Sequence, residues 1–323
     1  MLRVGYPSTL SAELFSDFPA GVELIAIPEN LDETIEIDVW IPDFYPARAI
    51  RAWPHLRGVR LVLAMLAGTE WIPPLVGPQV TVCSARGAHN VATAEWVIAA
   101  ILSMLKYFPF YQEVQRSGVW KRRFEASALY EAISGDTRPI YPPVLLEELT
   151  GKRVLLVGYG SIGKEIERML EPFRVEMTRV ARSARTEPAV HAAGELDSLL
   201  PDAQIVVLIV PYSEQTHWLI DQPQLALMQQ GALLVNAARG AVVNTDALVG
   251  ALQAGHIRAA LDVTDPEPLP QGHKLWNCPN VLITPHTGAA SPEAAPNALR
   301  TAAAELRRYM NGERLKNVVQ AAA

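Results

Sequence analysis

Three side chains able to bind an anion or move a proton lie in short, turn-rich stretches of the second half of the sequence. Arg239 lies in NAARG, Glu267 in DPEPLP and His286 in TPHTG. An arginine can clamp a carboxylate with two parallel hydrogen bonds, and a histidine beside a carboxylate can donate or accept a proton near neutral pH. This set suits hydride transfer to a 2-oxo acid. We expect Arg239 to hold the carboxylate and help polarise the ketone, and His286, kept charged and oriented by Glu267, to protonate the developing alkoxide.

Each of these stretches follows an apolar segment of strand length, at 232–237, 258–263 and 281–284. Asp262 lies at the end of the second segment. In open α/β sheets, ligands collect at the carboxyl ends of the parallel strands. The three side chains are therefore expected at successive strand ends around one crevice. Taken singly, an arginine or a histidine after a proline is more often an ordinary surface or turn residue.

A glycine-rich turn lies upstream, where the apolar segment RVLLV runs into GYGSIG. Gly158, Gly160 and Gly163 have the GxGxxG spacing, and a helical pattern, KEIERMLEPF, follows at once. The first glycine permits a tight turn, the second lets the backbone approach a pyrophosphate, and the third allows close packing of helix and strand. The helix N-terminus then offers free amides to the phosphates. The pattern predicts a dinucleotide site; the alternative is a glycine turn in an empty sheet.

The next strand ends without the acidic residue that usually binds the ribose hydroxyls, because Ala181 stands there. Arg182, Ser183 and Arg185 follow. A carboxylate would repel a 2′-phosphate, whereas a guanidinium matches phosphate geometry. We therefore predict NADP over NAD, with Arg182 on the 2′-phosphate, Ser183 assisting and Arg185 less certain. Arg179, inside the strand, is expected to point to solvent. The alternative is a solvated basic loop without a role.

The chain has 323 residues, which suggests two domains of ordinary size. Apolar segments of strand length alternate with helix-length segments through most of it, which is typical of βαβ units. The fold class is predicted to be α/β, with two doubly wound parallel-sheet domains: a Rossmann-type nucleotide domain and a flavodoxin-like substrate domain. The remaining expected strands are 2–6, 22–27, 37–41, 60–66, 80–83, 153–158, 176–181 and 204–210.

Three longer segments stand apart from this alternation. Residues 93–115 predict one long core or interface helix, bent at Pro109. Residues 121–150 contain three prolines and mixed charge, and are interpreted as a surface connection, or alternatively as an arm that contacts a partner subunit or covers the site. A final helix is predicted at about 292–311, packed back on the first domain.

Composition excludes several classes of function. The net charge of −6 argues against general attraction to nucleic acid or anionic membranes. Two cysteines far apart fit a reducing cytoplasm, and no histidine or cysteine spacing predicts a metal site. No signal peptide or membrane span is expected. The other six histidines are interpreted as ordinary structural residues: His55, His89, His191, His217, His256 and His273.

The sequence resembles the D-isomer-specific 2-hydroxyacid dehydrogenases, which include glyoxylate/hydroxypyruvate reductases and phosphoglycerate dehydrogenase, over nearly its whole length. The resemblance lies in GYGSIG (158–163), VPYSEQTHWLI (210–220), LVNAARGAVVNTDAL (234–248), ALDVTDPEPLP (260–270) and NVLITPHTGAAS (280–291). Arg239, Glu267 and His286 then take the family's catalytic roles. The resemblance also implies a homodimer.

Domain limits and further site residues follow from this resemblance. It implies a discontinuous substrate-binding domain at 1–94 and 290–323, and a dinucleotide-binding domain at 95–289 with a dimerisation arm around 95–150. The backbone amides of Ala67 and Gly68 would bind the substrate carboxylate, Asp262 the nicotinamide carboxamide, and Thr93 would lie near the cofactor. The other implied cofactor residues are Ser161, Ile162, Pro211, Thr216 and Ala237.

Three hypotheses for the function remain. The first is an NADPH-preferring reductase of a small 2-oxo acid such as glyoxylate or hydroxypyruvate. The second is an NAD-linked dehydrogenase of another acid, of the phosphoglycerate or phosphite type. The third is a non-catalytic dinucleotide sensor like some corepressors, which the presence of Arg239, Glu267 and His286 disfavours.

Overall fold

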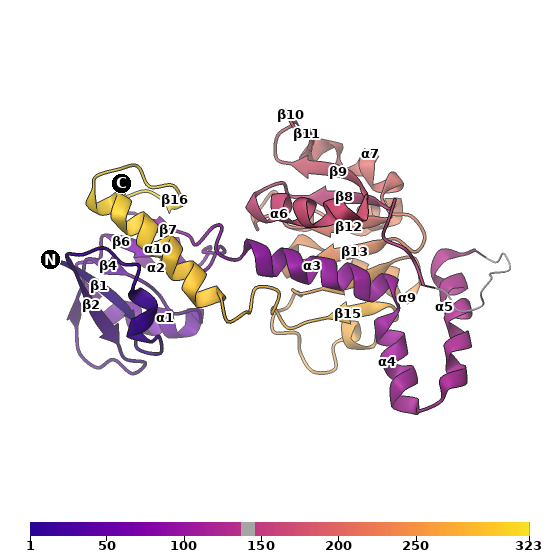
Figure 1. Ribbon diagram of the computed structural model, residues 1–323, viewed down its shortest axis with the longest axis horizontal. Coiled ribbons are helices and arrows are strands. Elements are labelled where there is room, and N and C mark those ends of the chain that lie inside the picture. The colour runs from indigo at the N-terminus through magenta and orange to yellow at the C-terminus, as the bar shows by residue number, and fades with distance from the viewer. Residues whose placement is uncertain (137–145, 323) are drawn as a thin grey trace. The chain divides into compact units, whose positions relative to one another are not determined.

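The computed structural model describes residues 1–136 and 146–322. The chain divides into two compact units (Figure 1). Unit 1 comprises Met1–Asn90 and Ala290–Ala323, and unit 2 comprises Val91–Ala289. The division falls four residues before the limit expected from the sequence at 94–95. Each unit is built around its own mainly parallel sheet, which confirms the predicted α/β class.

Unit 1 contains a six-stranded sheet in the order β16-β7-β6-β4-β1-β2. Its strands are β1 (Leu2–Pro7), β2 (Val22–Ile27), β4 (Val39–Trp40), β6 (Leu61–Leu63), β7 (Thr81–Cys83) and β16 (Val318–Gln320), with α1 (Pro46–Ala52) and α2 (Ile72–Val76) between them. A separate pair is formed by β3 (Ile35–Glu36) and β5 (Leu56–Arg57). The five parallel strands have the flavodoxin-like order, in which the succession of strands across the sheet reverses between β1 and β4.

The C-terminal helix α10 (Ala294–Met310) belongs to the core of unit 1. Its buried face, which includes Leu299 and Leu306, shares one apolar cluster with Val4 of β1 and Leu63 of β6. Figure 1 shows this yellow helix lying against the indigo and purple strands of the N-terminal segment. Chain segments nearly 300 residues apart therefore depend on each other for burial of their apolar surface.

Unit 2 contains an eight-stranded sheet in the order β10-β11-β9-β8-β12-β13-β14-β15. The strands are β8 (Arg153–Val157), β9 (Glu176–Ala181), β10 (Arg185–Thr186), β11 (Ala189–Ala192), β12 (Ile205–Leu208), β13 (Leu233–Asn236), β14 (Arg258–Leu261) and β15 (Val281–Ile283). The helices around them are α6 (Ser161–Leu170), α7 (Leu196–Leu199), α8 (Gln222–Leu227) and α9 (Thr245–Gln253). All strand pairs except β10–β11 are parallel.

The central strands of unit 2 are buried on both faces, as their unbroken apolar runs predict. Leu155 packs into a cluster on one face and Leu156 into a cluster on the other. From β11 to β14 the order is that of a Rossmann sheet, with the reversal between β8 and β12. The glycine turn follows β8, and Arg239, Glu267 and His286 follow β13, β14 and β15.

The segment expected to form one helix bent at Pro109 forms two helices instead. α3 (Asn90–Leu105) and α4 (Phe108–Ser117) meet at 61°, and Tyr107 between them has φ 53°. A proline has no amide hydrogen, and its ring collides with the carbonyl four residues earlier, here that of Leu105. The break therefore precedes Pro109, which lies in the first turn of α4. Within the described residues no single helix is long and apolar enough to cross a membrane; α3 and α4 pass that test only as this bent pair.

The described residues 120–134 contain more secondary structure than the surface connection predicted for 121–150. A 3₁₀ turn (Trp120–Phe124) leads into α5 (Glu125–Ser134), which the sequence interpretation missed. Ile133 anchors α5 to the sheet domain, because its carbonyl accepts a hydrogen bond from the side chain of Gln230. The prolines that marked this segment, at 139, 142 and 143, lie outside the described residues.

Candidate active site

His286 and Glu267 are hydrogen-bonded to each other, with 2.5 Å between His286 Nδ1 and Glu267 Oε1. Both side chains are nearly half exposed, so the pair faces solvent on one side. The hydrogen bond to Glu267 raises the pKa of His286 above its ordinary value, against opposing contributions from burial and from Arg239. The ring is held through Nδ1, which leaves Nε2 as the atom able to exchange a proton with a ligand.

Asp262 holds the loop that carries His286. Its carboxylate accepts hydrogen bonds from the amides of Thr287 and Gly288, both at 2.8 Å, and from the hydroxyl of Thr284 at 2.7 Å. The carboxylate is almost fully buried, and a Cβ on Gly288 would lie 2.7 Å from one of its oxygens. A carboxylate has about four acceptor sites. Three serve the loop here, so at most about one remains for the nicotinamide carboxamide that the sequence resemblance assigned to Asp262.

Arg239 lies on a tight turn after β13 and is half-buried. The buried side chain of Asn236 shapes this turn by donating to the carbonyl of Arg239 and accepting from the amide of Ala238. The guanidinium donates to the carbonyl of Ala238 at 2.8 Å. Arg239 also lowers the pKa of His286 electrostatically, so the two side chains are close enough to interact.

The loops that carry Arg239 and Glu267 touch through their backbones. A Cβ on Gly240 would lie 1.9 Å from the carbonyl oxygen of Thr264, so only glycine fits there. The hydroxyl of Thr245 binds the carbonyl of Asp265 and fastens the same contact. Together with the Asp262 contacts, this arrangement joins the three loops after β13, β14 and β15 into one rigid edge.

The glycine turn has the geometry that a dinucleotide requires. Gly158 has φ +112°, and a Cβ there would lie 2.6 Å from the carbonyl oxygen of Ile209 at the end of β12. A Cβ on Gly163 would lie 2.3 Å from the carbonyl oxygen of Gly158, so helix and strand are in close contact. A Cβ on Gly160 would meet nothing within 4 Å, and no side chain caps the helix there. The first amides of α6, which include those of Ser161 and Ile162, are therefore open to a phosphate.

The basic loop after β9 divides into two parts. Arg182 and Ser183 are exposed at the carboxyl end of β9, and β9 pairs with β8, the strand that leads into the glycine turn. Arg185 reaches back to this turn, where its guanidinium lies over the ring of Tyr159 and 3.4 Å from its carbonyl oxygen.

The expectation for Arg179 is wrong. Its side chain is half-buried rather than solvated, and it forms an ion pair with Glu167 on α6. This pairing lowers the pKa of Glu167. The helical face of α6, which sequence spacing alone does not place over β9, brings Glu167 to this strand. Arg179 is thus paired with a carboxylate of the protein, whereas Arg182 is exposed to solvent.

The remaining predicted cofactor residues of unit 2 lie in or beside the loops at the carboxyl ends of its strands. Thr216 closes the loop after β12, because its hydroxyl binds the carbonyl of Pro211 and the amide of Ser213. Ala237 continues β13, where its amide binds the carbonyl of Leu208. Thr93 is buried on α3, one turn before Trp96, which lies against Gly288.

Ala67 and Gly68 lie in unit 1, in the loop that follows β6. Within the described residues, neither of their amides donates a hydrogen bond to the protein. Two such amides in succession form a suitable site for an anion.

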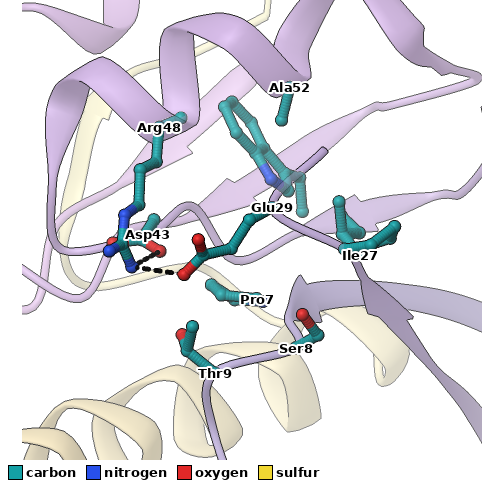
Figure 2. A pocket seen from close by; sticks show the side chains of 11 residues that line it. Pro7, Ser8, Thr9, Ile27, Glu29, Asp43, Arg48 and Ala52 are labelled. Carbon is teal, nitrogen blue, oxygen red and sulfur yellow. Dashed lines mark ion pairs between the residues drawn. The ribbon is translucent and has the colours of Figure 1, made fainter. Parts of the chain in front are cut away.

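A shallow hollow lies elsewhere on unit 1, at the carboxyl ends of β1, β2 and β4 (Figure 2). Arg48 crosses it to pair with Glu29 at 2.9 Å and approaches Asp43 at 3.7 Å. Ser8 and Thr9 line its opposite side. None of the predicted site residues lines this hollow, and its one cation is already bound to an anion.

Sequence reasoning missed the residues that support the site. Asn236, Gly240 and Thr245 touch no predicted ligand, and they act only by fixing the turns that carry Arg239 and Glu267. One signal was present, because Asn236 is a polar residue at the end of a strand that is otherwise apolar. The contact of Gly240 with Thr264 has no local signal, since it joins residues 24 positions apart.

The fold and this edge are those of a dinucleotide-binding α/β protein with a hydrogen-bonded histidine–glutamate pair. Residues 98–288 match the model of the D-isomer specific 2-hydroxyacid dehydrogenase, NAD binding domain. The chain belongs to this family.

Individual relatives support the assignment. A glyoxylate reductase from Thermococcus kodakarensis is 33% identical over 320 residues, which cover 89% of this chain and 92% of the relative. An uncharacterised Corynebacterium melassecola protein is 43% identical over 140 residues, and this match spans less than half (46%) of that relative's length and 42% of this chain. A Xanthobacter autotrophicus family member, crystallised with NADPH and MES, is 26% identical with a TM-score of 0.74, and the match covers 98% of each chain.

Proposed function

We propose that this protein is an NADPH-preferring reductase that converts a small 2-oxo acid, such as glyoxylate or hydroxypyruvate, into a D-2-hydroxy acid. The observation that carries the proposal is the hydrogen-bonded pair of His286 and Glu267 on the same sheet edge as the glycine turn. Family membership supports it, as does the name of the Thermococcus relative, a glyoxylate reductase.

The proposed reaction uses each side chain in a defined way. When bound, the nicotinamide supplies a hydride to the carbonyl carbon. Arg239 holds the substrate carboxylate and polarises the ketone, and the amides of Ala67 and Gly68 bind the same carboxylate. His286 donates a proton from Nε2 to the oxygen that becomes the hydroxyl, while Glu267 keeps the ring charged and oriented. In the reverse direction the same pair accepts the proton.

The preference for NADPH rests on Arg182 and Ser183. Their strand end lies next to the glycine turn, where a 2′-phosphate would need a cation, and Ala181 provides no carboxylate to bind a ribose hydroxyl. Arg185, which already contacts Tyr159 of the turn, adds to the positive field. The NADPH bound in the Xanthobacter relative is consistent with this choice.

A homodimer is also part of the proposal. The segment from α4 to α5 exposes Phe108, Trp120 and Phe124, with exposed fractions of 59%, 77% and 47%. Exposed large aromatic side chains are enriched at protein interfaces. Sedimentation analysis should give twice the mass of the chain, and Trp120→Ser with Phe124→Ser should shift the protein toward the monomer. A monomeric parent at micromolar concentration would refute this part.

The deciding experiment is a panel of 2-oxo acids, including glyoxylate, hydroxypyruvate, pyruvate and larger branched or aromatic acids, with NADPH and NADH. We expect turnover with a small acid, a higher kcat/KM with NADPH, and loss of kcat/KM by about a hundredfold or more in Arg239→Ala. Activity of Arg239→Ala equal to that of the parent would refute the mechanism. Tight NADPH binding without turnover of any acid would favour a sensor, and preference for NADH with another acid would favour the NAD-linked alternative.

A further inference from the structure

His89 is a buried histidine of unit 1 with a single, directed hydrogen bond. It is 6% exposed and immediately precedes α3. Its Nε2 lies 2.8 Å from the carbonyl oxygen of Met65. Because a carbonyl can only accept, Nε2 must carry the proton. Nδ1 is buried and has no hydrogen-bond partner among the described residues, so the polar character of this ring is directed entirely to Met65.

Met65 leads directly into the loop at 66–70, which contains Ala67 and Gly68. The next carbonyl, that of Leu66, accepts the amide of Ala85 at 2.9 Å. His89 and Ala85 both belong to the segment between β7 and α3, so one short segment fastens two successive carbonyls at the start of the loop. At the other end, the carbonyl of Thr69 accepts the amide of Ile72 at the start of α2.

Between these contacts lie Ala67 and Gly68, whose amides have no hydrogen-bond partner in the described part of the chain. The carbonyls of Met65, Leu66 and Thr69 are bonded, whereas the amides of Ala67 and Gly68 donate to no protein group. Because peptide groups are planar, the bonded Leu66 carbonyl sets the direction of the Ala67 amide. By holding the Met65 carbonyl, His89 fixes the preceding peptide plane, from which the loop starts. Binding of a carboxylate by two amides depends on the direction of those amides, because a hydrogen bond weakens steeply as it departs from linearity.

We infer that His89 is a positioning residue, which holds the loop at 66–70 in the conformation that binds the substrate carboxylate. This inference rests on the proposed function, and it replaces the interpretation of His89 as an ordinary core histidine. A side chain that only filled this buried position could be apolar. The histidine instead places one donor against one carbonyl.

The test compares two replacements of similar size. His89→Leu removes the donor, whereas His89→Gln retains an amide NH that can reach the Met65 carbonyl. For His89→Leu we expect KM for glyoxylate to rise about tenfold or more, with kcat changed less than about threefold, because carboxylate binding is shared by ground state and transition state. The affinity for NADPH should stay within about twofold, and His89→Gln should recover most of the KM. His256→Leu is the matched control, since His256 also bonds a backbone carbonyl, that of Leu225, but in unit 2.

Two further measurements separate this inference from the proposed function. Hydrogen exchange at the amides of Ala85 and Ile72, which bind the loop carbonyls, should speed up in His89→Leu and not in His89→Gln. Binding of oxalate, a dicarboxylate probe, should weaken in the same order. If the parent reduces no 2-oxo acid, the proposed function fails, and these two measurements still decide the role of His89. Unchanged exchange, oxalate affinity and KM in a folded His89→Leu protein would overturn the inference, as would His89→Gln behaving like His89→Leu.

Discussion

The backbone amide of His286 donates a hydrogen bond to the backbone carbonyl of Asp262, at 2.7 Å. The side chain of the same aspartate accepts the amides of Thr287 and Gly288, so His286 is bracketed by contacts to one residue. His286 itself has φ 53°, a left-handed conformation that is unfavourable for a side chain with a Cβ. The Asp262 contacts therefore hold the proposed proton donor in a backbone conformation that it would not adopt on its own.

Asp262→Asn should lower both stability and activity. Asparagine has one carboxamide oxygen, and its NH2 group would face a donor, so at least one buried amide loses its acceptor at a cost of about 1–3 kcal/mol. We expect that loss in the free energy of unfolding from urea titration, with a fall in kcat of about tenfold or more as His286 loses its position. Thr284→Val removes only the hydroxyl bond and should cost less on both scales. Equal effects of the two substitutions would contradict the bracketing role.

The pH dependence of reduction should follow the ionisation of His286. Its pKa is raised because Glu267 bonds the imidazolium, so the charged donor persists to higher pH and kcat/KM falls only as pH rises through the raised pKa. Glu267→Gln removes that cause, and the fall should move to lower pH. The contribution of the pair to folding stability changes with pH in the same direction. It is fully present below the unfolded-state pKa of about 6.5 and is lost as pH rises through the raised folded-state pKa. A kcat/KM profile that is unchanged in Glu267→Gln would show that another group donates the proton.

The cofactor preference should depend on Arg182 and not on Arg179. Arg182→Ala should lower kcat/KM for NADPH by about 10- to 100-fold, the loss of one or two hydrogen bonds to a charged phosphate, and leave NADH nearly unchanged. Arg179→Ala is the matched control, because Arg179 is paired with Glu167 and should alter stability without changing the NADPH/NADH ratio. Steady-state kinetics with both cofactors measures the ratio. An equal loss with NADH in Arg182→Ala would mean that the loop supports the fold rather than selecting the cofactor.

Gly240→Ala should disrupt the site although Gly240 touches no ligand. The added Cβ would fall 1.9 Å from the backbone oxygen of Thr264, which cannot move without shifting the loop that carries Glu267. We expect a loss of about 1–3 kcal/mol or more in unfolding free energy and a marked fall in kcat/KM. Gly250→Ala, on α9 with open space around its Cβ, should instead stabilise the protein by up to about 1 kcal/mol. Similar outcomes for the two glycines would show that the loop contact is not tight in solution.

Local pattern predicted the parts of the fold that depend on neighbouring residues. Six of the eight strands of unit 2 were placed to within one or two residues, because most of them are apolar runs. The short strands β10 and β11 were not predicted, because they lack such a run. The proline at position 109 predicted a bend in one helix. Helix α3 instead ends earlier, at Leu105, because a proline disrupts the helical turn that precedes it. α5 was missed because its segment was interpreted from nearby prolines rather than from its own helix-favouring residues.

The sequence by itself determined which groups could react and at which edge they would meet. Arg239, Glu267 and His286 each follow an apolar run, and parallel strands bring their carboxyl ends to one edge whatever the loops do. Tertiary structure alone decided how those groups are held. The Asp262 bracket, the contact of Gly240 with Thr264 and the pairing of Arg179 with Glu167 all join residues 12 to 26 positions apart. Such contacts depend on loop and helix placement to a fraction of an ångström, which no local periodicity encodes.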